Sequence, residues 1–78
     1  MDRIMSEVCV FLADGFEEIE GLTVVDLLRR AGIETRTVSI MGREEIRGAH
    51  GIIVKADSLF ENTDFSEVKM LVLPGGMP

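Results

Sequence analysis

The sequence predicts an α/β fold with a mostly parallel sheet, and two observations near the N-terminus carry this prediction. Residues 8–13 are six apolar residues without polar alternation, which indicates a strand covered on both faces. Residues 17–31 then change to a helical period, and Gly32 stands where helices commonly end in a left-handed residue. Residues 33–40 are rich in β-branched side chains and predict a second strand. Strand, helix and strand in this order nearly always form a right-handed parallel unit.

One side of the predicted helix should pack on the sheet, with Val24 and Leu27 at its margins. Glu17, Glu18 and Glu20 crowd the first turn, where the helix dipole favours each acidic side chain by about 0.3–1 kcal/mol. Glu17 and Glu18 are therefore expected to be solvated. For Glu20 two explanations stay open, which are a functional role and the same favourable interaction with the helix dipole. The five central positions of the packing side are Ile19, Leu22, Val25, Leu28 and Ala31.

The middle of the chain predicts short elements. Residues 46–47 and 52–56 flank the glycine-bounded turn 48–51 and indicate two short strands. Asp57 and Ser58 mark a turn or cap, and residues 59–66 predict a short helix or an irregular crossover, with Asn62, Asp64 and Ser66 as cap candidates.

Residues 69–73 form a further apolar run and predict a third core strand. Pro74, Gly75 and Gly76 end it, because proline lacks an N–H for the ladder and glycine permits a tight turn. Amide groups exposed in such a turn can hold an anion or an oxyanion, although an ordinary turn explains the same residues.

Composition excludes several classes of partner. Among 78 residues, 46% are hydrophobic and 28% are charged, which is typical of a globular protein. A net charge of -6 argues against nucleic acid and against an anionic membrane surface. No apolar run approaches the roughly 20 residues that span a bilayer, and no secretory signal precedes residue 8, so a cytoplasmic location is expected.

The sequence contains one cysteine and one histidine, so it offers few nucleophilic or metal-binding side chains. Cys9 lies inside the first apolar strand, where a buried hydrophobic role is expected over a nucleophilic one. His50 lies in the glycine-bounded turn, where an exposed position is expected, although a catalytic or anion-binding role is open if it faces a cleft. Neither a disulfide nor a zinc site built from this chain alone is expected, and no metal is assigned.

Three core strands and one clear helix cannot cover both faces of a parallel sheet. We therefore predict that residues 1–78 are the N-terminal part of a single domain whose remainder is a required partner. Residues 1–6 are predicted to be a polar lead-in.

Four segments together resemble the ThiJ/PfpI family, and they occur in one order with plausible spacings. The resemblance implies a flavodoxin-like, doubly wound, mostly parallel sheet, of which only the N-terminal part is present. It also implies a homodimer and an enzyme without a cofactor. The segments are residues 13–20 (ADGFEEIE), 28–33 (LRRAGI), 48–52 with 56–57 (GAHGI and AD), and 73–76 (LPGG).

The resemblance also implies site residues. By alignment, Glu20 is the family's catalytic glutamate, and Gly75 and Gly76 are the glycine pair whose amides border a cysteine pocket. The reactive cysteine belongs to a strand-to-helix elbow that would lie beyond Pro78, so this chain alone should be inactive. His50 falls where many relatives carry an arginine.

The implied function is a cysteine enzyme that acts on small reactive carbonyls, as a glyoxalase or deglycase does, or on amide bonds. A redox sensor or chaperone using the same cysteine is the alternative, as is a protein of the thiazole monophosphate biosynthesis type. A flavodoxin-like binding or receiver module is a further alternative, although Asp14 is a lone aspartate at a strand end.

Overall fold

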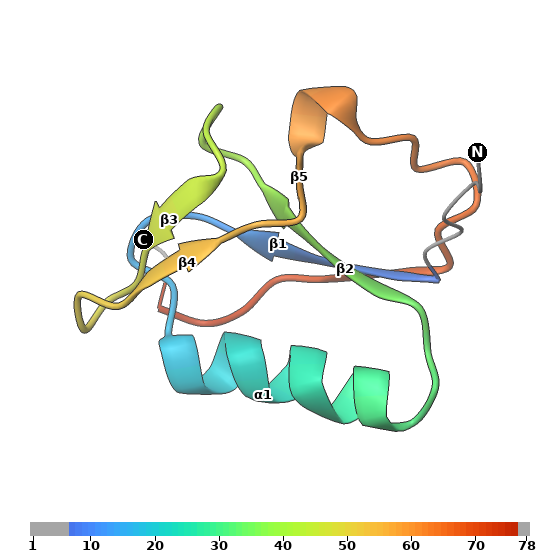
Figure 1. The fold of residues 1–78 in the computed structure, drawn as a ribbon, viewed down its shortest axis with the longest axis horizontal. Helices are drawn as coiled ribbons and strands as arrows, with labels where there is room; N and C mark the ends of the chain where they lie inside the picture. Colours follow the sequence, from blue (N-terminus) through green and yellow to red (C-terminus); the bar gives the residue numbers. More distant parts are fainter. Residues whose placement is uncertain (1–6, 77–78) are drawn as a thin grey trace.

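The computed structural model describes residues 7–76, in which one helix lies along one face of a parallel sheet and a β-hairpin stands at one end of it (Figure 1). The elements are β1 (Val8–Leu12), α1 (Glu18–Arg30), β2 (Thr35–Ser39), β3 (Glu45–Arg47), β4 (Ile53–Lys55), β5 (Ser58–Leu59), the 3₁₀ helix η1 (Phe60–Asn62) and β6 (Met70–Val72).

The main sheet has the strand order β5-β2-β1-β6, and its three pairings are parallel. Val8 of β1 stands opposite Thr35 on one side and Met70 on the other. Strand β1 is central in the sheet, so it is paired on both edges and its side chains are distributed over both buried faces. This explains its unbroken apolar sequence. The order β2-β1-β6 is the 2-1-3 order of flavodoxin-like sheets, so the predicted fold class is confirmed.

Helix α1 begins after Glu17, whose side chain accepts a hydrogen bond from Ile19 N at 3.3 Å. It ends before Gly32, which has φ +81° and confirms the predicted left-handed stop. Basic residues in the last turn suit the negative end of the helix dipole.

The side of α1 that packs on the sheet is rotated from the predicted one. Val25 is buried and Leu22, Val24 and Leu28 are partly buried against the core, as predicted. The prediction is wrong for Ile19, which is 75% exposed, and for Ala31, which is also exposed. The buried row begins at Glu18 and continues through Gly21 to Val25, and Ile19 lies just outside this row because successive helical residues are turned by about 100°.

The predicted pair of short strands is the antiparallel hairpin β3–β4. Ile46 of β3 is fully buried and belongs to the same core cluster as Val10, Leu12 and Phe16. The hairpin therefore packs on the same core as the helix.

The segment after the hairpin contains a strand that the sequence did not reveal. Ser58 and Leu59 form β5, which pairs with the end of β2, and the predicted short helix is the single turn η1. Two residues are too few to show a period, so a turn was the natural expectation. Of the predicted caps, Asp64 accepts a hydrogen bond from Ser66 N at 2.9 Å.

The predicted third strand is present as β6, but within residues 7–76 it pairs on one edge only, with β1. Met70 and Leu71 are 56% and 54% exposed for this reason. The predicted lead-in, residues 1–6, lies outside the described residues. None of the described helices is long and apolar enough to cross a bilayer.

Candidate functional site

The strand order identifies the end of the sheet where a site belongs. In a doubly wound sheet, ligands bind beyond the carboxyl ends of the two strands at which the order reverses, and here these strands are β1 and β6. The turns that follow them are residues 13–17 and 73–76. Figure 1 shows both turns at the same end of the molecule, beside the hairpin and the start of α1.

Gly75 and Gly76 bring the turn after β6 against the first turn of α1. The amide of Glu17 donates to Gly75 O at 2.9 Å. A side-chain carbon added at Gly75 would lie 2.5 Å from Oε1 of Glu20, and one added at Gly76 would lie 2.7 Å from Glu17 N. Gly76 also has φ +89°, which favours glycine. The two turns can approach this closely because both positions lack a side chain.

The three predicted site residues therefore lie together, with Glu20 exposed to solvent on the first turn of the helix. Within residues 7–76, no backbone hydrogen bond uses the amide of Gly75 or Gly76 as its donor. An acidic side chain can move a proton, and amide groups of a glycine turn beside it could stabilise an oxyanion if they face the same ligand.

Glu18, two residues before Glu20, is 2% exposed, so the prediction that it is solvated is wrong. Its Oε2 accepts hydrogen bonds from His50 N at 2.8 Å and from Ile52 N at 3.2 Å, and its Oε1 lies 2.8 Å from His50 Nδ1. Burial by itself would raise the pKa of this carboxyl. The hydrogen bonds from His50 and Ile52 outweigh burial and hold the pKa at about 2.

His50 is exposed as predicted, with 64% of its side chain accessible, but it is paired with acids on two positions. Its Nδ1 lies 2.8 Å from Glu18 Oε1 and 3.8 Å from Glu17 Oε1. The hydrogen bond to Glu18, with the charges of Glu17 and Glu18, raises the pKa of His50 above its usual value. Glu17, Glu18 and His50 offer ligand atoms within 4.8 Å of one another, but Glu18 already accepts three protein hydrogen bonds, so we assign no metal.

Backbone contacts fix the hairpin turn beside the β1–α1 turn. Gly15 N donates to Arg47 O at 2.8 Å, and Ala49 N donates to Phe16 O at 2.8 Å. Asp14 accepts from Arg47 N at 3.0 Å and forms an ion pair with Arg43. The hairpin thereby forms one side of the β1–β6 site.

Comparison with known proteins agrees with this geometry. The model of the DJ-1/PfpI family matches residues 6–78. The chain belongs to this family. The resemblance noted for the ThiJ/PfpI motifs is thereby confirmed.

Similar DJ-1/PfpI members come from distant organisms. The chain is 37% identical over 70 residues to "Deglycase TK1284" of Thermococcus kodakarensis, covering 90% of this chain and 42% of that protein. It is 31% identical over 78 residues to "Protein DJ-1 homolog B" of Arabidopsis thaliana, covering all of this chain and 18% of that protein. The solved structure "Toxoplasma gondii DJ-1, oxidized" superposes with a TM-score of 0.86 at 39% identity, covering 91% of this chain and 39% of that one. The chain thus spans less than half of each relative.

Cys9 is not part of this DJ-1/PfpI site. It is fully buried in β1, as predicted, between Arg36 of β2 and Leu71 of β6 in the register. Burial raises the pKa of its thiol, and the charge of Arg36 opposes this only in part. A buried thiol with a raised pKa is a poor nucleophile.

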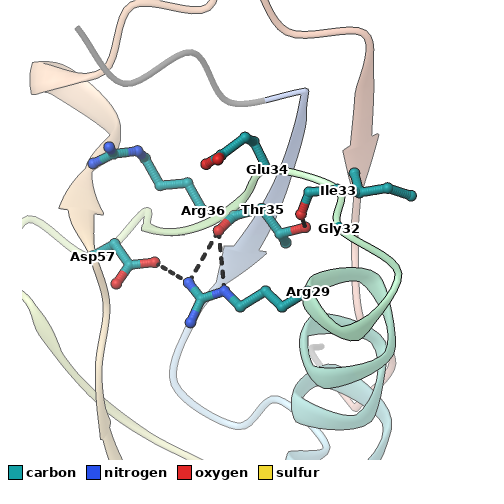
Figure 2. Close-up of a pocket in the computed structure, with 7 residues that line it drawn as sticks. All are labelled: Arg29, Gly32, Ile33, Glu34, Thr35, Arg36 and Asp57. Atoms are coloured by element: carbon teal, nitrogen blue, oxygen red, sulfur yellow. Dashed lines mark hydrogen bonds and ion pairs between the residues drawn. The ribbon is translucent and has the colours of Figure 1, made fainter. Parts of the chain in front are cut away.

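A hollow lies away from this site, at the opposite end of the sheet, where α1 ends and β2 begins (Figure 2). It has a volume of about 500 Å³. The guanidinium of Arg29 donates to Thr35 O at 3.0 and 3.2 Å and to Asp57 Oδ2 at 2.7 Å. These bonds tie the helix end to the sheet, so the polar groups of this pocket already serve a structural purpose. Its lining is Arg29, Gly32, Ile33, Glu34, Thr35, Arg36 and Asp57.

Sequence reasoning missed the pairing of Glu18 with His50. The one signal in the sequence is Gly48, at which an added side-chain carbon would lie 2.3 Å from Cδ of Glu18. A glycine in a turn is explained equally well by turn geometry, so this signal could not be read before the structure.

Proposed function

We propose that residues 1–78 are the N-terminal part of a single DJ-1/PfpI-type domain and supply the acid and the glycine turn of a cysteine-dependent enzyme. The remainder of the domain would supply the nucleophilic cysteine from a strand-to-helix elbow. The share of each relative that the chain covers supports this division. Small reactive carbonyls, of the glyoxal and methylglyoxal type, are the proposed substrates, consistent with a relative named as a deglycase.

The close approach of Glu20 to Gly75 is the observation that carries this proposal. The carboxyl side chain of Glu20 and the turn after β6 lie together near the switch point, which supports a role for them where a substrate oxygen and a proton-transfer group need to meet. The absence of a side chain at Gly75 lets the Glu20 carboxyl group lie against this turn, which supports a shared role for the two residues.

The chemistry follows from these positions. A thiolate would add to the aldehyde carbon and form a C–S bond, while the carbonyl oxygen becomes an oxyanion near Gly75 and Gly76. Water would protonate that oxygen. Glu20 would then take the proton from the carbon bonded to sulfur, which leaves an enediolate, and return it to the neighbouring carbonyl carbon. The hydroxyl proton passes to the second oxygen, and a thioester of the 2-hydroxy acid forms. Hydrolysis of the resulting thioester by water would release a hydroxy acid and restore the thiol, so methylglyoxal and water give lactate with no external oxidant.

The test is methylglyoxal consumption by the intact protein that carries the elbow cysteine. Glu20→Gln should lower kcat/KM by roughly 10²-fold or more, the usual contribution of a positioned acid or base. Asp26→Asn is the matched control, because Asp26 is an exposed acid on the same helix that pairs only with Arg30 at 2.9 Å. Unchanged turnover in Glu20→Gln, or absence of a cysteine at the elbow, would overturn the proposal.

A redox function of the same cysteine is the second candidate, because the T. gondii relative is described as oxidized. Stoichiometric oxidation to the sulfinate without consumption of glyoxals would favour it. Amide hydrolysis is tested in the same assay with peptide substrates. A homodimer is proposed from the family resemblance, and sedimentation tests it. The cytoplasmic location expected from the sequence is a proposal that cell fractionation tests.

A further inference from the structure

We propose that Glu18 and His50 form a proton-sensitive latch that holds the tip of the β3–β4 hairpin against the β1–α1 turn. The latch would position one side of the proposed active site, and in this respect it rests on the proposed function. Its structural behaviour does not depend on catalysis, because none of its groups is assigned a role in the reaction.

In the latch, the buried carboxylate of Glu18 accepts hydrogen bonds from groups at the tip of the hairpin. Both oxygens of Glu18 are used: His50 N and Ile52 N donate to Oε2, and Nδ1 of His50 faces Oε1. All these donors belong to the hairpin, whereas Glu18 belongs to α1, so the hydrogen bonds join two elements that are remote in sequence. Gly48 leaves the space that the carboxylate occupies.

Only part of this arrangement titrates near neutral pH. Glu18 stays ionised because its pKa is about 2. His50 has a raised pKa, so in the folded protein it keeps its proton to a higher pH than a free histidine. Glu17, at 3.8 Å, adds a second negative charge beside the ring.

Other charged groups lie on the hairpin side. Arg43 is paired with Asp14, and the backbone hydrogen bond and the charge of Arg47 help to lower the pKa of Asp14. Lys55 lies 3.6 Å from Glu44. The turn at residues 73–76 contributes no ionisable side chain. His50 is therefore the group at the latch whose charge changes as pH rises past the ordinary range of a histidine.

Loss of the His50 proton weakens the latch without removing it. The neutral ring can still donate from Nδ1 to the ionised Glu18 carboxylate, but the attraction between opposite charges is lost and the contact becomes weaker. The sign follows from linkage: a raised folded-state pKa means that the stabilisation is complete below the ordinary pKa of 6.5 and is lost as pH rises through the folded-state pKa. Opening of the hairpin tip should therefore become more frequent at high pH.

Amide hydrogen exchange measured by NMR on the intact protein tests the latch. The reporters are Ala49 N, which donates to Phe16 O, and Ile52 N, which donates to Glu18. After correction for intrinsic exchange, their protection should fall about 2–5-fold as His50 loses its proton, the size of the contribution that a partly exposed ion pair makes. Ala56 N, which donates to Glu44 O away from the tip, is the internal control and should change little.

His50→Asn is the matched variant, because its side-chain amide can donate from nearly the position of Nδ1 and does not titrate. The variant should show no pH-dependent step at Ala49 and Ile52. A flat protection profile in the wild-type protein, or an identical step in His50→Asn, would overturn the proposal. If the variant does not fold, the pH dependence of protection at Ala49 and Ile52 in the wild-type protein tests the proposal by itself.

Turnover of methylglyoxal by the same sample separates this proposal from the proposed function. A pH step at Ala49 and Ile52 in a protein without turnover would support the latch and contradict the enzyme. Turnover without the step would support the enzyme and contradict the latch.

Discussion

Glu18 and Glu20 lie two residues apart on the first turn of α1 and meet opposite environments. Glu18 is buried under the hairpin tip and bonded by three donors, whereas Glu20 is exposed beside the glycine turn after β6. Both positions are explained by neighbours that lack a side chain, Gly48 for Glu18 and Gly75 for Glu20. The difference is that Glu18 forms its hydrogen bonds within the protein, while the exposed Glu20 is the residue proposed to contact a ligand. Changes near Glu18 should therefore affect stability first, and changes near Glu20 should affect activity first.

Gly48→Ala should have the largest effect on stability. The added carbon would lie 2.3 Å from both Cδ and Oε2 of Glu18, and Glu18 cannot move without losing its partners. A cost of about 1–3 kcal/mol or more is typical of overpacking, which corresponds to a fall in Tm of roughly 5–20 °C for a domain of this size. Thermal unfolding followed by circular dichroism measures it. A variant as stable as the wild type would show that the hairpin tip is not held as described.

Glu18→Gln should lower Tm by roughly 5–15 °C, because an amide offers one oxygen in place of two and turns its NH₂ toward the donors of the hairpin. Glu20→Gln, measured in parallel, should change Tm by no more than about 2 °C, since Glu20 is exposed. Equal shifts in the two variants would remove the contrast between the two carboxylates.

Acidification should reduce the contribution of Glu18 to stability. Its folded-state pKa of about 2 lies below the ordinary value of 4.5, so the ionised carboxylate stabilises the fold above about pH 4.5 and this stabilisation is lost as pH falls toward 2. Other acids titrate in the same range, including Asp14, whose pKa is lowered first by its hydrogen bond from Arg47 N. The informative quantity is the difference in Tm between wild type and Glu18→Gln, which should shrink steadily from pH 5 to pH 2.

Gly75→Ala should have the smallest effect on stability and still reduce activity. The added carbon would meet Oε1 of Glu20 at 2.5 Å, but this atom is the far end of an exposed, flexible side chain that can rotate away. We expect Tm to change by less than about 3 °C and kcat/KM to fall by roughly tenfold or more, because the acid is displaced. The double variant Gly75→Ala with Glu20→Gln should be no less active than Glu20→Gln alone, and additive losses would contradict a shared role.

Much of the fold was predictable because it depends on local pattern. The apolar run of β1, the helical period of α1 and the stop at Gly32 identified a parallel βαβ unit, and the short strands of the hairpin followed from two glycines. The two-residue strand β5 was missed because its sequence is too short to carry a period. The exposure of Ile19 was missed because the spacing of apolar residues shows that one side of the helix packs on the core, but it does not fix the rotation of that side to within one residue.

The amino-acid pattern was enough to predict the fold class and, through the family resemblance, Glu20, Gly75 and Gly76 as candidate site residues. Which acid is buried and which faces solvent depends on contacts that form only in the folded protein. Glu17, Glu18 and Glu20 share one residue type and one helical turn, so no local property separates them. The separation comes from the hairpin, whose tip is 32 residues from Glu18 along the chain and brings His50 to within 2.8 Å of it. Burial of a charge depends on the partners that the fold brings to it, and these partners lie elsewhere in the sequence.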